Sequence, residues 1–254
     1  MTIAPRRIVR SIVAGSACLL LAAPTGVEAS LPSLSRDSAE RVSMEASLLV
    51  AQFERALRSN DPGDFADAVA CSFRETTLAR FVRQGDVPTR RASIYALGLV
   101  GSYKVNAAVA SALKDADPVN RAMADRALKA IWYRADSLEN NERLRKIMVS
   151  IDRGLHDLAI EQADQLVKLA PDFAEAYNQR AIAYFFSGRP AQSAEDCRKT
   201  IDRNPYHLGA LSGLAQCLLR LDRRDEAIKV LRRASAIEPY NLDLKRTIRD
   251  LEAL

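Results

Sequence analysis

Aromatic residues are scarce in this chain of 254 residues, at 6%, although 48% of its residues are hydrophobic. Glycine and proline are also limited, with ten residues of each. This composition excludes a disordered chain, a collagen and a protein with many membrane spans, and the length suggests one or two domains. Abundant Ala and Leu with few aromatics and few glycines are typical of stacked helices, so we expect an all-α fold.

Histidine is nearly absent, since His156 and His207 are the only two. Their spacing assembles no metal site, and no cysteine pair has the two-residue gap of a zinc or redox motif. A phosphate-binding glycine loop, a Gly-x-Ser-x-Gly elbow and a His-Glu-x-x-His motif are missing too. We therefore predict no catalytic, metal-binding or cofactor-binding residues and a protein that is not an enzyme.

A strong excess of one charge is missing as well. The net charge of +5 falls to +3 when the segment 1–29 is set aside, because that segment holds three arginines and one glutamate. Arg220, Arg223 and Arg224 form a basic cluster, but Asp222 and Asp225 lie among them. Interleaved charges are typical of a solvated surface, so we do not expect nucleic acid as a partner.

The segment 1–29 has the parts of a secretory signal peptide. Arg6, Arg7 and Arg10 precede an uncharged stretch over 11–24, and small residues follow at 27 and 29. We expect Sec-type export to the periplasm or beyond, with cleavage after Ala29. Two alternatives stay open: an uncleaved signal that anchors the protein in the inner membrane, and twin-arginine export. Contact with a membrane is expected only through this segment.

The C-terminal half has a regular internal repeat. A constant spacing of 34 separates three prolines, namely Pro171, Pro205 and Pro239. Seventeen positions before each proline is a turn position, occupied by Gly154, Gly188 and Asp222. Twelve positions before each proline is a small residue, namely Ala159, Ser193 or Ala227. Glycine permits a tight turn, the small residue lets two helices pack closely, and proline ends the second helix. This two-helix period resembles the tetratricopeptide repeat.

The resemblance implies a right-handed helical-repeat solenoid with units over 140–173, 174–207 and 208–241. The first unit is degenerate, because Arg143 occupies the usual aromatic position and Ile147 the following small one. The segment 242–254 has apolar residues at helical spacing, and we expect it to cap the stack.

The preceding segment, 43–138, is predicted to form a shorter helical repeat behind a polar leader over 30–42. Asp86 and Arg90 recur 31 positions later as Asp117 and Arg121. An aspartate followed by a proline suits the N-cap and first turn of a helix. The pattern resembles a short bacterial HEAT repeat, and an irregular helical bundle is the open alternative. The two repeat types could share one continuous superhelix.

The resemblance to tetratricopeptide repeats also implies a concave groove, lined by the first helix of each unit, that takes extended peptides or partner helices. Six residues of the second and third units are our predicted partner-binding set: Asn178, Ile182, Phe185, Ser212, Gln216 and Leu219. Apolar side chains supply contact area, and amides can hydrogen-bond a peptide backbone. Ordinary packing between units is the alternative for Ile182 and Phe185.

The sequence thus predicts an exported protein-interaction scaffold whose protein or peptide partner it does not identify. Two alternatives stay open. One is a hydrolase-like enzyme with its site where the two repeat segments meet, and the other is a structural accessory of the envelope that self-associates.

Three cysteines, Cys71, Cys197 and Cys217, remain after the expected cleavage. An odd number in a chain of this length does not describe a disulfide framework. We expect them to behave as small buried apolar residues. A disulfide between Cys197 and Cys217, on neighbouring helices, stays open.

Overall fold

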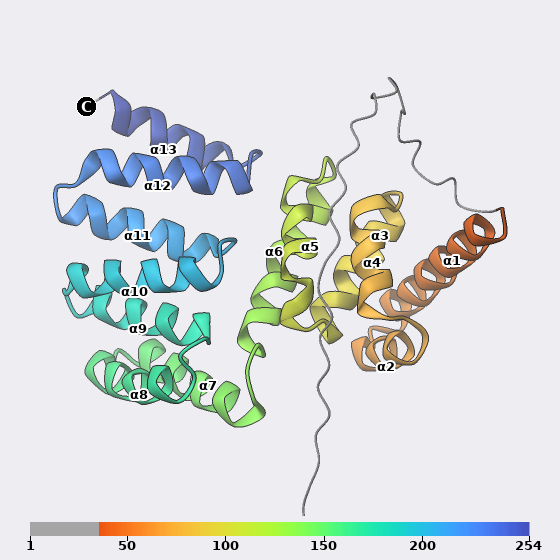
Figure 1. Cartoon of the computed structure of the whole chain (residues 1–254), viewed down its shortest axis with the longest axis horizontal. Helices are drawn as coiled ribbons and strands as arrows, with labels where there is room; N and C mark the ends of the chain where they lie inside the picture. The colour runs from red at the N-terminus through yellow and green to blue at the C-terminus, as the bar shows by residue number, and fades with distance from the viewer. Residues whose placement is uncertain (1–35, 254) are drawn as a thin grey trace, which may run out of the picture.

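The computed structural model describes residues 36–253, so the expected signal peptide lies outside the described residues. In the described part every regular element is a helix, which confirms the predicted all-α fold (Figure 1). The N-terminal elements are α1 (Arg36–Ser59), α2 (Pro62–Ser72), α3 (Glu75–Gln84), α4 (Val87–Val100), η1 (Tyr103–Val105), α5 (Asn106–Ser111), η2 (Ala112–Lys114) and α6 (Pro118–Tyr133). The C-terminal elements are α7 (Leu138–Asp152), α8 (His156–Leu169), α9 (Ala174–Phe186), α10 (Pro190–Arg203), α11 (Leu208–Arg220), α12 (Arg224–Ile237) and α13 (Leu242–Glu252).

Helices α7 to α13 form one stack in which each helix packs against the next (Figure 1). Helices α9, α11 and α13 begin at a constant spacing of 34, and so do α8, α10 and α12. The small residues Ala159, Ser193 and Ala227 are buried between paired helices. Ser193 leaves no polar group unsatisfied, because its hydroxyl donates to the carbonyl of Ala181 at 2.8 Å. Small side chains at these positions therefore let the paired helices approach closely.

Each helical pair of this stack turns through the same backbone conformation. Gly154 and Gly188 have φ angles of +74° and +73°, and Asp222 has +57° at the equivalent position of the third pair. This left-handed region favours glycine and tolerates aspartate. The first helix, α7, begins at Leu138, slightly before the expected start of its unit at 140, because the hydroxyl of Ser137 accepts from the amide of Asn140.

Helices α1 to α6 form a second stack with its own apolar core. Asp117 caps α6, which confirms the predicted N-cap, and Asp86 caps α4 in the same way. The equivalent arginines reach back in the same way: Arg90 donates to the carbonyl of Gly85 and Arg121 to that of Ala116. The same two contacts at the start of α4 and of α6 explain why aspartate and arginine recur 31 positions apart. The HEAT assignment itself stays a prediction.

The polar leader predicted over 30–42 is wrong in its second half, because α1 begins at Arg36. The apolar side chains of Val42 and Ala46 pack against the core of the N-terminal stack, so the helix is amphipathic from its first turns. The polar residues Arg36, Asp37 and Ser38 hide the start of this helix in the sequence.

The N-terminal stack lies beside the C-terminal stack and does not continue its superhelix (Figure 1). The hydroxyl of Tyr103 donates to the carbonyl of Arg203 at 2.8 Å, and the Asn106 amide donates to Oδ1 of Asn204 at 3.0 Å. Three apolar residues of the C-terminal stack also pack against the N-terminal core, namely Tyr206, Leu208 and Ile237. One continuous superhelix is therefore not formed, because these contacts bind the first stack to the side of the second and third units.

None of the helices in residues 36–253 combines the length and apolar character needed to cross a bilayer.

Candidate functional site

The predicted partner-binding residues surround a cavity of about 290 Å³ between α9 and α11. Four of the six line it: Asn178, Ile182, Phe185 and Gln216. The rest of the lining is Phe186 and five small residues, namely Ala181 on α9, Ser193 and Cys197 on α10, and Gly209 and Gly213 on α11. The two glycines leave space that a larger side chain on α11 would fill.

A second cavity of about 340 Å³ lies between α11, α12 and α13. Ser212, Gln216 and Leu219 line it. Because Gln216 belongs to both linings, the two cavities are neighbours along α11, and together they are called the groove below. Glu238 and Asp243 are the only charged residues in the lining of the second cavity, so this end of the groove is acidic.

The six side chains differ in how free they are to bind a partner. Asn178 is only 7% exposed, and its amide nitrogen donates to Oε1 of Glu175 at 2.7 Å. The guanidinium of Arg220 lies 3.8 Å from the centroid of the Phe185 ring and covers it. Gln216 is exposed, and three others are half-buried: Ile182, Ser212 and Leu219. Asn178 and Phe185 therefore serve the fold, whereas the other four are available to a partner.

A buried polar cluster lies where the two stacks meet. Glu175 is 2% exposed, and its Oε1 accepts from the side-chain amides of Asn178 and Gln179 at 2.7 Å each. Its Oε2 lies 2.9 Å from Nε2 of His207. The ring of Trp132 stacks on the His207 ring, with centroids 4.4 Å apart and planes 20° apart. We call Glu175, His207 and Trp132 the junction cluster.

The hydrogen bonds of His207 define its tautomer. Its Nδ1 accepts from the backbone amide of Ala210 at 3.0 Å, which caps α11. Nδ1 is therefore unprotonated, and the proton on Nε2 donates to Glu175. Both ring nitrogens are engaged in holding helix ends, so His207 is a capping residue and has no free nitrogen to act as a general base.

The sequence predictions missed the junction cluster as a site. Its members come from α6, α9 and the start of α11, so nothing in the local pattern brings them together. The available signals were weak: a glutamate in the first turn of α9 and a histidine just before α11, each close to alanines and leucines. The chain's single tryptophan was a further one.

The second histidine does not assemble a catalytic site. The His156 ring stacks on Phe186 with centroids 5.5 Å apart, and its buried Nδ1 has no hydrogen-bond partner among the described residues. Within residues 36–253, no group of three or more His, Cys, Asp or Glu is placed to hold a metal ion.

Cys197 and Cys217 are buried free thiols on α10 and α11. The neighbouring Cys217 thiol and burial raise the pKa of Cys197 above its usual range. Cys217 also makes a hydrogen bond with Ser193, at 3.1 Å. The pair therefore behaves as polarisable packing between two helices. The expectation of burial is wrong for Cys71, which is a free and exposed thiol.

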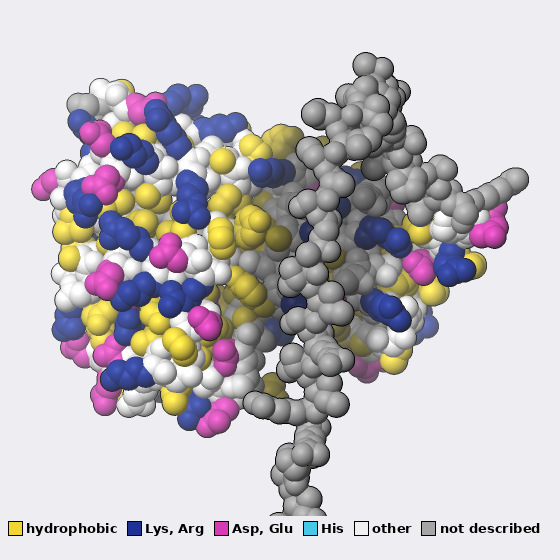
Figure 2. Space-filling model, viewed as in Figure 1, with side chains coloured by type: hydrophobic (Ala, Val, Ile, Leu, Met, Phe, Trp, Pro, Cys, Tyr) yellow, Lys and Arg dark blue, Asp and Glu magenta, His cyan; other side chains and the backbone are white. Residues whose placement is uncertain are grey.

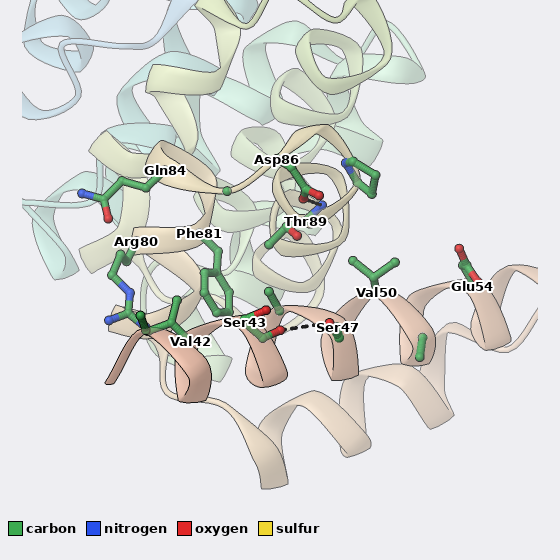
Figure 3. Close-up of a pocket in the computed structure, with 15 residues that line it drawn as sticks. Val42, Ser43, Ser47, Val50, Glu54, Arg80, Phe81, Gln84, Asp86 and Thr89 are labelled. Atoms are coloured by element: carbon green, nitrogen blue, oxygen red, sulfur yellow. Dashed lines mark hydrogen bonds between the residues drawn. The ribbon is translucent and has the colours of Figure 1, made fainter. Parts of the chain in front are cut away.

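A larger cavity, of about 690 Å³, lies in the N-terminal stack between α1 and the α3–α4 hairpin (Figure 3). Val42 and Val50 of α1 and Phe81 of α3 give it apolar walls. Asp86 at its edge accepts from the amide of Thr89 and caps α4. The carboxylate of Asp86 is thus engaged in capping α4.

Charged side chains are mixed over the face of the C-terminal stack that Figure 2 shows. Basic and acidic residues alternate there, and hydrophobic side chains gather toward the side that faces the N-terminal stack. Arg223 pairs with Glu226 at 2.6 Å, so part of the predicted basic cluster is neutralised locally. This distribution offers no continuous basic track for a phosphate backbone.

Comparisons with known proteins match the C-terminal stack. A family model for the N-terminal TPR repeats region of Psidin matches residues 141–248. A TPR repeat-containing protein of Rhizobium etli is 26% identical over 126 residues, covering 50% of this chain and 62% of that protein. WD and tetratricopeptide repeats protein 1 of Mus musculus is 40% identical over 76 residues, covering 29% of this chain and 11% of that protein. The chain therefore spans less than two thirds of these relatives.

Among solved structures, the first TPR of Spaghetti (RPAP3), bound to an HSP90 peptide, shares 24% identity at a TM-score of 0.44. The match covers 46% of this chain and 94% of that one. YrrB, described as a TPR protein with an unusual peptide-binding site, shares 16% identity at a TM-score of 0.41. This match covers 78% of this chain and 97% of the YrrB chain.

Proposed function

We propose that this protein, whose residues 141–248 are a tetratricopeptide-repeat region, is a non-enzymatic scaffold that binds an extended peptide or a helix of a partner protein in the groove. The observation that carries the proposal is the pair of neighbouring cavities along α11. Four predicted residues with free or half-free side chains line them: Ile182, Ser212, Gln216 and Leu219. Apolar pockets beside amide and hydroxyl groups suit a peptide, since they accept side chains and hydrogen-bond a backbone.

The first prediction tests the groove with Gly213→Ala. A methyl group at Gly213 would meet the Sγ atom of Cys197 at 3.4 Å, an ordinary contact, so the variant folds. Alanine raises the free energy of unfolding by about 0.5–1 kcal/mol in a helix interior, and it narrows the cavity at the same time. The probe is a peptide selected on the unmodified protein from a displayed library of short random sequences. We expect it to bind Gly213→Ala at least about tenfold more weakly, although the variant is more stable.

Ile182→Ala supplies the second arm of this test, and Leu169→Ala on the exposed surface of α8 is its matched control. Binding of the selected peptide, followed by isothermal titration calorimetry, should weaken in Ile182→Ala and stay unchanged in Leu169→Ala. Equal affinity of Gly213→Ala, Ile182→Ala and the unmodified protein would refute the groove as the binding site. Light scattering of the same protein samples would reveal self-association as a mass that increases with concentration.

We further propose that the protein acts outside the cytoplasm. The support is the basic head, the short apolar body and the small residues at 27 and 29, all within the segment 1–29. N-terminal sequencing of the protein isolated from the periplasm should begin at Ser30. An intact N-terminus in the membrane fraction would instead support the anchored form, and an intact soluble cytoplasmic protein would refute export.

A further inference from the structure

A separate cavity of about 410 Å³ lies between the two stacks and shares no lining residue with the groove. It falls within the range of about 300–1,000 Å³ that is usual for small-ligand sites. The junction cavity, as we call it, is bounded by the end of α6, the start of α9, the end of α10 and Tyr103. Because pockets between two packed bodies are frequent ligand sites, its lining is a candidate binding surface.

Asn204, which lines this cavity, has an unpartnered hydrogen-bond donor. The residue is completely buried, and its Oδ1 accepts from Nδ2 of Asn106 at 3.0 Å and from the amide of Tyr206 at 3.3 Å. Asn106 is itself oriented by Trp132, whose Nε1 donates to its Oδ1 at 2.8 Å. These hydrogen bonds orient the Asn204 amide so that Oδ1 is the acceptor. Nδ2 of Asn204 then has no partner among the described residues. A buried donor without an acceptor is unusual, and it is satisfied if a ligand oxygen occupies the cavity.

Carboxylates dominate the charge of the same cavity. Asp136, Asp172 and Glu175 line it together with one basic residue, Arg203. The guanidinium of Arg203 is already engaged, because it donates to the carbonyls of Pro171 and Lys199 and lies over a tyrosine ring. Three carboxylates against one guanidinium give the lining an excess of negative charge, which favours a cation.

The three carboxylates are not equally available. Glu175 is saturated by two amides and His207, and Oδ1 of Asp136 accepts from the Ser137 amide. Asp172 is exposed and forms no hydrogen bond or ion pair with any described residue. Asp172 is thus the free carboxylate of the cavity, and Oδ2 of Asp136 is available beside it.

Aromatic rings complete the lining, with Tyr103, Trp132 and Phe173 contributing from three different elements. Aromatic faces attract guanidinium and ammonium groups, and they also pack against the methylene stem of a basic side chain. Carboxylates, rings and one amide donor together match a group that is cationic at one end and has a carbonyl oxygen at the other.

We propose that the junction cavity binds a basic amino-acid unit, of arginine or lysine. Its cationic group lies between Asp172, Asp136 and the aromatic walls, and its carbonyl or carboxylate oxygen accepts from Nδ2 of Asn204. The same chemistry occurs in a free amino acid and in a residue of a peptide. The site is independent of the groove, so the experiments on this site do not test the proposed scaffold function.

Trp132 makes this proposal directly measurable, because it is the only tryptophan of the chain and lines the cavity. The full mature protein is titrated with L-arginine, L-lysine, N-acetyl-L-arginine amide and L-citrulline, and tryptophan emission is recorded. Free N-acetyltryptophanamide in parallel corrects for collisional quenching. We expect saturable changes with the arginine or lysine compounds and none with citrulline, which keeps the shape of arginine without its charge.

Asp172→Asn is the decisive variant, since Asp172 has no partner to lose and the fold should be unchanged. It should weaken binding at least tenfold, whereas Asp250→Asn, an exposed aspartate on α13, should bind as the unmodified protein does. Tighter binding of free arginine or lysine would assign a free amino acid, and tighter binding of the blocked amide would assign a peptide residue. No saturable change at millimolar cation, an equal response to citrulline, or full affinity in Asp172→Asn would each overturn the proposal.

Discussion

At the scale of single residues, Asp115 shows how a buried ion pair joins α4 to the loop that precedes α6. Its side chain is 3% exposed and accepts from Nε and a terminal nitrogen of Arg90 at 2.6 and 2.9 Å. This bidentate pairing lowers the pKa of Asp115 from its ordinary 3.8 to about 2, with help from the Asp117 amide and Asn120. The charged carboxylate is therefore part of the folded state.

The pH dependence of stability follows from that lowered pKa. Since the folded state holds the proton less tightly than the unfolded chain, Asp115 stabilises the fold above pH of about 4 and loses this effect as the pH falls toward 2. The contribution is about 2 kcal/mol. Urea unfolding followed by circular dichroism at pH 6 and pH 2.5 should show this loss in the unmodified protein and a smaller one in Asp115→Asn.

Asp125→Asn is the control, because Asp125 forms a surface ion pair with Lys129 one turn along α6. Such pairs contribute about 0.2–1 kcal/mol at most, so its pH profile should follow that of the unmodified protein. A profile of Asp115→Asn that runs parallel to the unmodified protein would show that the ion pair with Arg90 carries none of the acid sensitivity.

Residue roles could be predicted from the sequence only where their cause is local. Asp117 caps α6 through amides two and three positions ahead, and this pattern is visible in the sequence. The pairing of Glu175 with His207 spans 32 positions, and that of Asn106 with Asn204 spans 98. No periodicity links such positions, because the folded arrangement of the two stacks decides them.

At the scale of helices and turns, the three equivalent turns of the C-terminal stack provide an internal comparison. Gly154, Gly188 and Asp222 all have positive φ angles, and a Cβ added at either glycine would meet nothing within 4 Å. Any effect of substitution at a glycine turn is therefore conformational and involves no new clash. The repeat period predicted these turns because glycine at a fixed position marks a backbone requirement.

Gly188→Ala should lower the free energy of unfolding by about 1 kcal/mol, the usual penalty for a side chain in the left-handed region. Asp222→Gly should raise it by less than about 1 kcal/mol, since glycine relieves the backbone but gains entropy in the unfolded chain. Urea unfolding monitored by circular dichroism measures both, and Gly154→Ala should repeat the result of Gly188→Ala. Stabilisation by Gly188→Ala would contradict the requirement for positive φ at this turn.

Helices were predictable where a repeat or an N-cap marked them. The start of α1 was not, because the apolar side of its first turns has little but alanine and one valine, Val42, among polar residues. The groove residues were placed on the correct helices by the repeat, yet the role of Asn178 in holding Glu175 depends on a neighbouring unit and could not be inferred.

At the scale of the whole molecule, two stacks are joined along their sides by a narrow polar relay. Trp132 donates to Asn106, and Asn106 donates to Asn204. All three are buried, and Nε1 of Trp132, the side-chain amide of Asn106 and Oδ1 of Asn204 each find a partner within the relay. The side-by-side arrangement could not be predicted from repeat periods. A repeat period describes how neighbouring units stack and gives no information about contacts between distant segments.

Asn106→Ala should loosen the docking of the stacks without unfolding them. The variant removes the acceptor for the indole of Trp132 and the donor to Asn204, and leaving buried groups unsatisfied costs about 1–3 kcal/mol. We expect tryptophan emission to shift to longer wavelength, while the helical circular dichroism signal at room temperature is retained. Asn241→Ala, which removes the N-cap of α13 and a hydrogen bond to Glu238, should leave the emission unchanged. Unaltered emission in Asn106→Ala would argue against the relay as the link between the stacks.

The same long-distance contacts bear on how the chain folds. During synthesis Asn106 emerges 98 positions before Asn204, and Tyr103 emerges 100 positions before Arg203. Helical pairs form from neighbouring residues and can assemble quickly, whereas closing a loop of this length is slow. Until that closure, the indole of Trp132 lacks the histidine ring on which it stacks. We therefore expect the last event in folding to be the meeting of the two stacks, limited by the closure of this long loop and not by the formation of any single helix.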